Sequence, residues 1–149
     1  MNIDLSGRRA VVTGGSRGIG RAIALAFAES GAAVSICARG AEALEEGRRA
    51  IAACGATAHA ATCDLADAEA VAGYVATAAA ALGGIDILVN NASAFGSANS
   101  EAGWASSISV DLLATVRASW AALPHMEKAG GGAIVNISSI SGLRAAART

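Results

Sequence analysis

The sequence predicts a doubly wound α/β fold, in which helices cover both faces of a parallel sheet with strand order 3-2-1-4-5. Five short apolar runs alternate with segments of helical periodicity, and the first run leads into a glycine-rich turn. This strict alternation implies parallel strands that are joined by right-handed crossovers. Ligands of such sheets bind at the carboxyl ends of the strands, beside the point where the strand order reverses.

Strands are expected where the apolar runs are short and nearly continuous, at Ala10–Thr13, Ala33–Cys37, Ala58–Cys63, Ile85–Val89 and Ala133–Ile137. Between them, apolar residues recur at helical spacing and are expected to face the sheet. The four stripes are Ile19, Ile23 and Phe27; Leu44, Gly47, Ile51 and Cys54; Val71, Val75 and Leu82; and Ile108, Leu112, Val116, Trp120 and Leu123. No linker, charge run or repeat divides residues 1–149, which are interpreted as one domain.

Composition and charge exclude several classes of function. Of the 149 residues, 54% are hydrophobic, only 3% are aromatic, and the net charge is −1. The chain therefore offers no basic or aromatic surface for nucleic acid and no basic patch for an anionic membrane. Cys37, Cys54 and Cys63 lack metal-ligand spacing and are interpreted as small reduced core residues. No apolar run has the length of a signal or transmembrane segment, so a cytoplasmic protein without a metal site is expected.

The turn after the first predicted strand, Thr13-Gly14-Gly15-Ser16-Arg17-Gly18-Ile19-Gly20, is a candidate phosphate site. Glycine permits close approach of a ligand to the backbone, and the following helix presents unpaired N–H groups at its positive end. Glycines also mark ordinary loops, but here a strand precedes the turn, and a helix and a second strand follow it. This context favours an anion cradle.

Four separated motifs resemble those of the short-chain dehydrogenases/reductases. They are Thr13-Gly14-x-x-x-Gly18-Ile19-Gly20, Asp64-Leu65, Asn90-Asn91-Ala92 and Ile134-Val135-Asn136-Ile137-Ser138-Ser139. The resemblance covers nearly the whole chain. It implies a Rossmann fold, a nicotinamide cofactor, and an enzyme that interconverts a carbonyl and an alcohol by hydride transfer.

The resemblance also assigns the cofactor contacts. Asp64 stands where the family has the acid that accepts a hydrogen bond from the adenine amino group, and Leu65 lies beside the ring. Asn90 and Asn91 order the turn beneath the cofactor. Turn formation alone is the alternative for the two asparagines, and a loop carboxylate or helix cap is the alternative for Asp64. Ser93 replaces the family's usual glycine. The expected cofactor-binding residues are Gly14, Ser16, Arg17, Gly18, Ile19, Gly20, Arg39, Asp64, Leu65, Asn90, Asn91 and Ala92.

Arg39 determines the predicted choice of cofactor. It follows the second strand, 19 residues beyond Gly20, where an NAD-preferring protein usually places an acid for the ribose hydroxyls. The guanidinium groups of Arg39 and Arg17 instead complement a 2′-phosphate, so NADP(H) is predicted and NAD(H) is less favoured. A solvated charge at the start of a helix is the alternative for Arg39.

The predicted catalytic residues are Ser139 and Asp111. By the family pattern, the second serine of Ser138-Ser139, which precedes x-x-Gly142, holds the substrate oxygen. Asp111 stands where the family has an asparagine that binds a water of the proton relay. An ionised aspartate only accepts hydrogen bonds, so a modified relay is expected. The alternative for Ser139 is a hydroxyl with a role in the turn only. The alternative for Asp111 is a tolerated substitution.

The family's Tyr-x-x-x-Lys pair is absent from residues 1–149, because Tyr74 and Lys128 lie in other predicted helices. We favour the interpretation that these residues are only part of an oxidoreductase. This interpretation predicts negligible reductase activity for residues 1–149 alone. A non-catalytic nucleotide-binding or interaction module is the alternative.

The substrate is predicted only as a small carbonyl or alcohol, because Ser93–Gly103 and Ser141–Thr149 supply only partial walls. His59 and His125 are interpreted as structural. The predicted helix Trp104–Met126 carries more apolar surface than a solvated helix needs. Since the family commonly pairs this helix between subunits, a homodimer or homotetramer is expected.

Overall fold

The computed structural model describes residues 3–95 and 99–140. Its strands are β1 (Arg9–Thr13), β2 (Ala33–Ala38), β3 (Ala58–Thr62), β4 (Ile87–Asn90) and β5 (Ala133–Asn136). Its helices are α1 (Gly18–Glu29), α2 (Ala41–Ala53), α3 (Ala68–Leu82), α4 (Glu101–Ser107), the π-helical segment η1 (Ile108–Leu113) and α5 (Ala114–Lys128). Among the described residues, no helix combines the length and apolar character needed to cross a bilayer.

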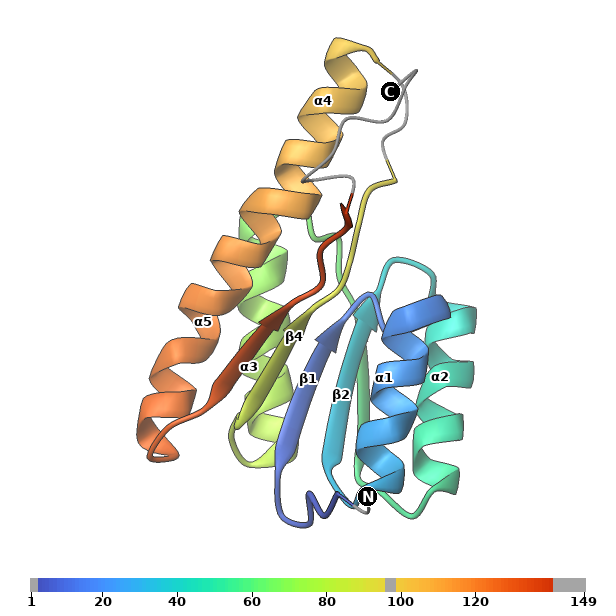
Figure 1. Ribbon diagram of the computed structural model, residues 1–149, viewed down its shortest axis with the longest axis vertical. Coiled ribbons are helices and arrows are strands. Elements are labelled where there is room, and N and C mark those ends of the chain that lie inside the picture. Colours follow the sequence, from blue (N-terminus) through green and yellow to red (C-terminus); the bar gives the residue numbers. More distant parts are fainter. Residues whose placement is uncertain (1–2, 96–98, 141–149) are drawn as a thin grey trace.

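The sheet confirms the predicted topology. All neighbouring strands are parallel, in the order β3-β2-β1-β4-β5. Figure 1 shows α1 and α2 on one face and α3 and α5 on the other, while α4 extends the line of α5 beyond the sheet. The strand order reverses between β1 and β4, so the switch point lies between those two strands.

Two apolar cores fill the spaces between the sheet and its helices, because successive strand residues point to opposite faces. The core under α1 and α2 is built from Val12, Ala24, Ala28, Val34, Ile36, Leu44, Ile51 and Val89. The core under α3 and α5 includes Val11, Cys37, Val71, Val75, Leu88, Ala118 and Met126.

The buried faces of α1 and α5 differ from the prediction. In α1 the fully buried residues are Gly20, Ala24 and Ala28. Of the predicted stripe, Ile23 and Phe27 are partly buried and pack against the core, whereas Ile19 is 63% exposed. In α5 they are Ala114, Ala118, Ala122 and Met126, whereas Trp120 is 70% exposed. The prediction chose the larger apolar residues, but small side chains at i, i+4 spacing let these helices lie close to the sheet and to α3. In α2 and α3, by contrast, Leu44, Gly47, Ile51, Val71 and Val75 are buried as predicted.

Cys54 corrects a further prediction. Cys37 and Cys63 are buried, but Cys54 is exposed. It is the C-cap of α2, and its thiol donates a weak hydrogen bond to the Ala50 carbonyl oxygen at 3.5 Å. Because α2 ends at Ala53, Cys54 does not continue the helical face on which Leu44 and Ile51 pack against the sheet.

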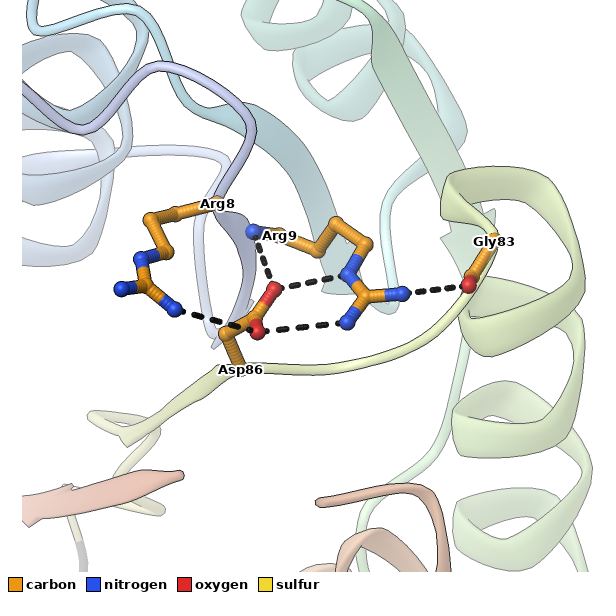
Figure 2. Close-up of polar contacts among 4 residues, drawn as sticks. All are labelled: Arg8, Arg9, Gly83 and Asp86. Carbon is orange, nitrogen blue, oxygen red and sulfur yellow. Dashed lines mark hydrogen bonds and ion pairs between the residues drawn. The ribbon is translucent and has the colours of Figure 1, made fainter. Parts of the chain in front are cut away.

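β4 begins at Ile87, two residues later than predicted, because Asp86 is used to tie the amino end of the sheet together. Its carboxylate accepts the backbone N–H of Arg9 at 2.9 Å, the Nε–H at 2.7 Å and an Nη2–H at 3.2 Å. Figure 2 shows this arrangement, with Arg8 beside the carboxylate and Arg9 also donating to the Gly83 carbonyl oxygen. These interactions lower the pKa of Asp86 below its usual value, chiefly through the hydrogen bond from the Arg9 side chain.

Candidate functional site

The glycine-rich turn holds the start of α1 against the end of β1. Gly14 has a φ of +69°, which L side chains rarely adopt. A Cβ on Gly20 would lie 2.3 Å from the Gly14 carbonyl oxygen and 2.4 Å from Asn91 Nδ2. Both positions therefore require glycine, one for the direction of the chain and the other for close packing.

Asn91 and Thr13 join this turn to the end of β4. The Asn91 side-chain amide donates to the carbonyl oxygens of Thr13 at 3.1 Å and Gly14 at 3.2 Å. Thr13 Oγ1 accepts the backbone N–H groups of Asn91 at 3.1 Å and Ala92 at 3.3 Å, and it donates to the Val89 carbonyl oxygen at 3.4 Å. These bonds fix the two strand ends on either side of the switch point.

The first turn of α1 has the features of an anion site. Arg17 is the N-cap residue, its side chain caps no N–H, and no acidic residue lies in the first turn. The N–H groups at the start of a helix lack intrahelical acceptors and carry the positive end of the helix dipole. Arg17, Gly18 and Ile19 are exposed, so this helix start is open to a ligand.

A depression of about 300 Å³ lies at the carboxyl ends of β2 and β3. Its lining residues are Arg39, Thr62, Cys63, Asp64 and Ala70. Arg39 and Asp64, which were predicted from two different strand ends, thus line the same depression. Asp64 Oδ1 accepts the Ala66 N–H at 3.1 Å, which orients this carboxylate in its turn. Leu65 belongs to the core beneath and is not among the lining residues.

Asn90 connects the end of β4 to β5 and α5. Its Nδ2 donates to Asn136 Oδ1 at 2.9 Å and to Ser119 Oγ at 3.2 Å. The side chain is buried, and among the described residues its Oδ1 has no hydrogen-bond partner. Of the two neighbouring asparagines, Asn91 therefore orders the glycine-rich turn, whereas Asn90 bridges the other half of the sheet.

Asp111 lies in η1, the π-helical interruption between α4 and α5. Its Oδ1 accepts the backbone N–H of Ala94 at 2.8 Å, which ties η1 to the segment after β4. The positive φ of that segment falls on Phe95, at +49°, and not on Ser93. A side chain at residue 93 therefore imposes no left-handed strain, and Ser93 Oγ accepts the Phe95 N–H at 3.1 Å.

Ser139 is exposed and lies three residues beyond the end of β5. The structure does not bring Tyr74 or Lys128 to this region. Tyr74 belongs to the buried face of α3. Its hydroxyl hydrogen-bonds with Ser35 Oγ at 3.0 Å, and burial raises the pKa of Tyr74 well above its usual value. Lys128 lines a separate cavity with Arg9 at the other end of the sheet. Gly142 and the rest of 141–149 lie outside the described residues, as do 96–98 of the predicted substrate wall.

Two residues of this region were not predicted from the sequence. Thr13 holds the β1 and β4 ends together, and Cys63 contributes to the wall of the depression. A signal was present for each, because Thr13 directly precedes the first glycine of the turn and Cys63 directly precedes Asp64. Sequence spacing identified the turn and the acid, but not their hydrogen-bonding and packing neighbours.

The sequence profile of the short chain dehydrogenase family matches residues 8–149. The chain belongs to the short-chain dehydrogenase/reductase family. It is 42% identical over 146 residues to a D-threitol dehydrogenase of Mycolicibacterium smegmatis, a match that covers 91% of this chain and 54% of that protein. The chain spans about half the length of the curated relatives it matches.

Solved structures of short-chain dehydrogenases/reductases share the fold. A metagenomic short-chain oxidoreductase in complex with NADP superposes with a TM-score of 0.88 at 42% identity, over 97% of this chain and 67% of that one. A NAD⁺-bound xylitol dehydrogenase gives 0.89 at 29% identity, over 95% and 56%. Proteins of similar structure thus include one bound to NADP and one bound to NAD⁺.

Proposed function

We propose that the protein is an NADP(H)-dependent oxidoreductase that interconverts a carbonyl and an alcohol, and that residues 1–149 supply its nucleotide-binding part. The observation that carries the proposal is the arrangement of three adjacent strand ends. The glycine-rich turn follows β1, and the depression with Arg39 and Asp64 lies at the ends of β2 and β3. One edge of the sheet therefore offers an anion cradle beside a charged depression, as an extended dinucleotide requires.

The residues present fit two parts of such a cofactor, its diphosphate and its adenine. The uncapped start of α1 would hold the diphosphate through its free N–H groups and its dipole. Asp64 would accept a hydrogen bond from the adenine amino group, because its carboxylate lines the depression. Asn91 contributes indirectly, by holding the turn in place through the Thr13 and Gly14 carbonyl oxygens.

Charge supports NADP(H) over NAD(H). Arg39 lines the depression and occupies the position after β2 at which an acid would hold the ribose hydroxyls. A guanidinium group makes charge-assisted hydrogen bonds to a 2′-phosphate, and Arg17 at the start of α1 adds a second positive charge to this edge of the sheet. Because relatives bind both cofactors, this proposal rests on the side chains of this chain itself.

The bound cofactor would donate or accept the hydride. Ser139 would orient the substrate oxygen by donating a hydrogen bond, and Asp111 would hold the segment after β4 and alter the polarity of the proton relay. The family's Tyr-x-x-x-Lys pair does not occur in residues 1–149, so we assign the proton donor to none of these residues. We therefore expect negligible reductase activity from residues 1–149 alone.

The proposed assembly is a homodimer or homotetramer formed through the outer face of α4, η1 and α5. Large apolar side chains are exposed along this continuous helical run, which projects beyond the sheet in Figure 1. They are Trp104, Ile108, Leu112, Leu113, Trp120 and Leu123. Contiguous exposed apolar surface is typical of an interface. A full-length protein that remains monomeric at micromolar concentration would contradict this assignment.

The catalytic part of the proposal is tested with the full-length protein and a panel of aldehydes, ketones and sugars, by following NADPH oxidation. We expect turnover with at least one carbonyl, and a loss of about 100-fold in kcat for Ser139→Ala, as is typical when one donor to a reacting oxygen is removed. Ser138→Ala is the matched control and should keep its activity. NADPH binding without turnover of any carbonyl would instead favour the nucleotide-binding module.

A further inference from the structure

Arg117, in the first turn of α5, reaches the connection between β3 and α3, which we call the Asp64 turn (residues 64–67). Its Nη1 donates a hydrogen bond to the Ala66 carbonyl oxygen at 3.1 Å. Figure 1 shows α3 and α5 on the same face of the sheet, and the two helices share one core. Within the described part of the chain, no other side chain from outside the Asp64 turn and α3 hydrogen-bonds to the backbone of this turn.

The bonds within the Asp64 turn show what this contact restrains. Asp64 Oδ1 accepts the Ala66 N–H at 3.1 Å, and the Asp64 carbonyl oxygen accepts the Asp67 N–H at 3.1 Å. The peptide group between Ala66 and Asp67 is therefore held at both ends, its N–H by Asp64 and its carbonyl oxygen by Arg117. Rotation of this peptide group breaks both bonds. Arg117 thus restrains the turn that orients the Asp64 carboxylate.

Leu65 holds the same turn from beneath, but in a different way. It is 7% exposed and belongs to the core under α3 and α5. Apolar burial is non-directional, so it keeps the turn against the sheet without fixing the direction of a peptide group. A hydrogen bond from a charged guanidinium does fix that direction. Without Arg117 the turn should therefore stay folded through Leu65 and lose its single orientation.

We propose that Arg117 is a positioning residue for the nucleotide, because it keeps the Asp64 carboxylate in the orientation that binding requires. This inference rests on the proposed function, in which Asp64 accepts a hydrogen bond from the adenine amino group. Asp64 lines the depression, whereas Arg117 is not among its lining residues. Arg117 therefore acts through the turn and not by contact with the nucleotide. A carboxylate that is ordered before binding loses less freedom when the nucleotide arrives, so affinity is higher.

The first test measures the Asp64 turn in the full-length protein without nucleotide. Arg117→Met removes the donor and keeps an unbranched side chain with good helix propensity. Amide hydrogen exchange in peptides that cover residues 64–67 should be about tenfold faster than in the unmodified protein, as expected for the loss of one hydrogen bond from a charged donor. Arg49→Met is the matched control, because Arg49 pairs with Glu45 on α2. An unchanged exchange rate in Arg117→Met would overturn the proposal.

The second test compares the dissociation constants of NADPH and deamino-NADPH. The analogue carries a carbonyl oxygen in place of the adenine amino group, so it lacks the donor for Asp64. We expect the unmodified protein and Arg49→Met to bind NADPH about tenfold more tightly than the analogue, and Arg117→Met to lose most of this preference.

The preference separates positioning from other effects of Arg117. A general loss of stability, or the loss of a positive charge that attracts the cofactor, would weaken the binding of both ligands equally. A preference that Arg117→Met leaves unchanged would therefore show that Arg117 does not act through Asp64. If the unmodified protein binds neither ligand, or binds both equally, the proposed role of Asp64 fails, whereas hydrogen exchange still decides whether Arg117 holds the turn.

Discussion

Gly20→Ala is the substitution that connects the stability of the fold most directly to nucleotide binding. The added Cβ would lie 2.3 Å from the Gly14 carbonyl oxygen and 2.4 Å from Asn91 Nδ2, so the start of α1 or the Asn91 side chain must move. Moving Asn91 breaks its bonds to the Thr13 and Gly14 carbonyl oxygens, a loss of about 2 kcal/mol, and overpacking costs about as much again. Better helix propensity of alanine offsets about 1 kcal/mol. The expected net loss is about 3 kcal/mol in the free energy of unfolding.

The assay is urea unfolding of the full-length variant, followed by NADPH titration under conditions in which it is folded. We expect weaker NADPH binding together with the lower stability, because the turn and the start of α1 move together. Gly73→Ala is the matched control: Gly73 is exposed in α3, nothing lies within 4 Å of its added Cβ, and the same gain in helix propensity applies. A Gly20→Ala protein that is as stable as Gly73→Ala and binds NADPH like the unmodified protein would show that residue 20 does not require glycine.

Two further substitutions test other contacts. Asp86→Asn removes the negative charge that pairs with Arg9. Urea unfolding at neutral pH should show a loss of about 3 kcal/mol in the free energy of unfolding. Because pairing lowers the folded-state pKa of Asp86, this stabilisation is complete above the unfolded-state value of about 3.9 and is lost as the pH falls through the lower folded-state value. If the difference in free energy of unfolding between Asp86→Asn and the unmodified protein stayed constant as the pH fell, the predicted loss of stabilisation at acid pH would be wrong. Asp111→Asn keeps an oxygen for the Ala94 N–H but removes the charge, so the thermal midpoint should not change while the pH profile of kcat should. Identical pH profiles would make Asp111 a tolerated substitute for asparagine.

The sheet was predictable from the sequence because strand burial on both faces leaves a strong pattern. Apolar runs separated by helical periodicity imply parallel strands, and handedness rules then restrict their order. The faces of α1 and α5 were not predictable from residue size. Alanines at residues 24, 28, 114, 118 and 122 are buried because the helices lie close to their neighbours, and only the packed structure reveals that separation.

In the candidate site, too, some residues were predictable from the sequence and others were not. Spacing located the glycine-rich turn, Arg39 and Asp64, because each begins within two residues of the end of a recognisable strand. The contacts that join these strand ends come from residues far apart in the sequence. Asn91 reaches Thr13 across the switch point, and Asp111 reaches Ala94 from a π-helical turn that no periodicity predicts. Asn90 and Asn91 likewise have different hydrogen-bond partners because their side chains point in different directions at the end of β4. The residue type alone does not reveal those directions.

We propose above all that one edge of this sheet binds NADP(H). The most direct measurement is the ratio of the dissociation constants for NADH and NADPH, in the full-length protein and in Arg39→Asp, with Arg49→Gln as a control for an exposed arginine on α2. We predict tighter NADPH binding in the unmodified protein, an unchanged ratio in the control, and a shift toward NADH of about tenfold to hundredfold in Arg39→Asp, the range for one or two charge-assisted hydrogen bonds. Equal affinity for the two cofactors in the unmodified protein, or a ratio that Arg39→Asp leaves unchanged, would contradict NADP(H) selection by Arg39.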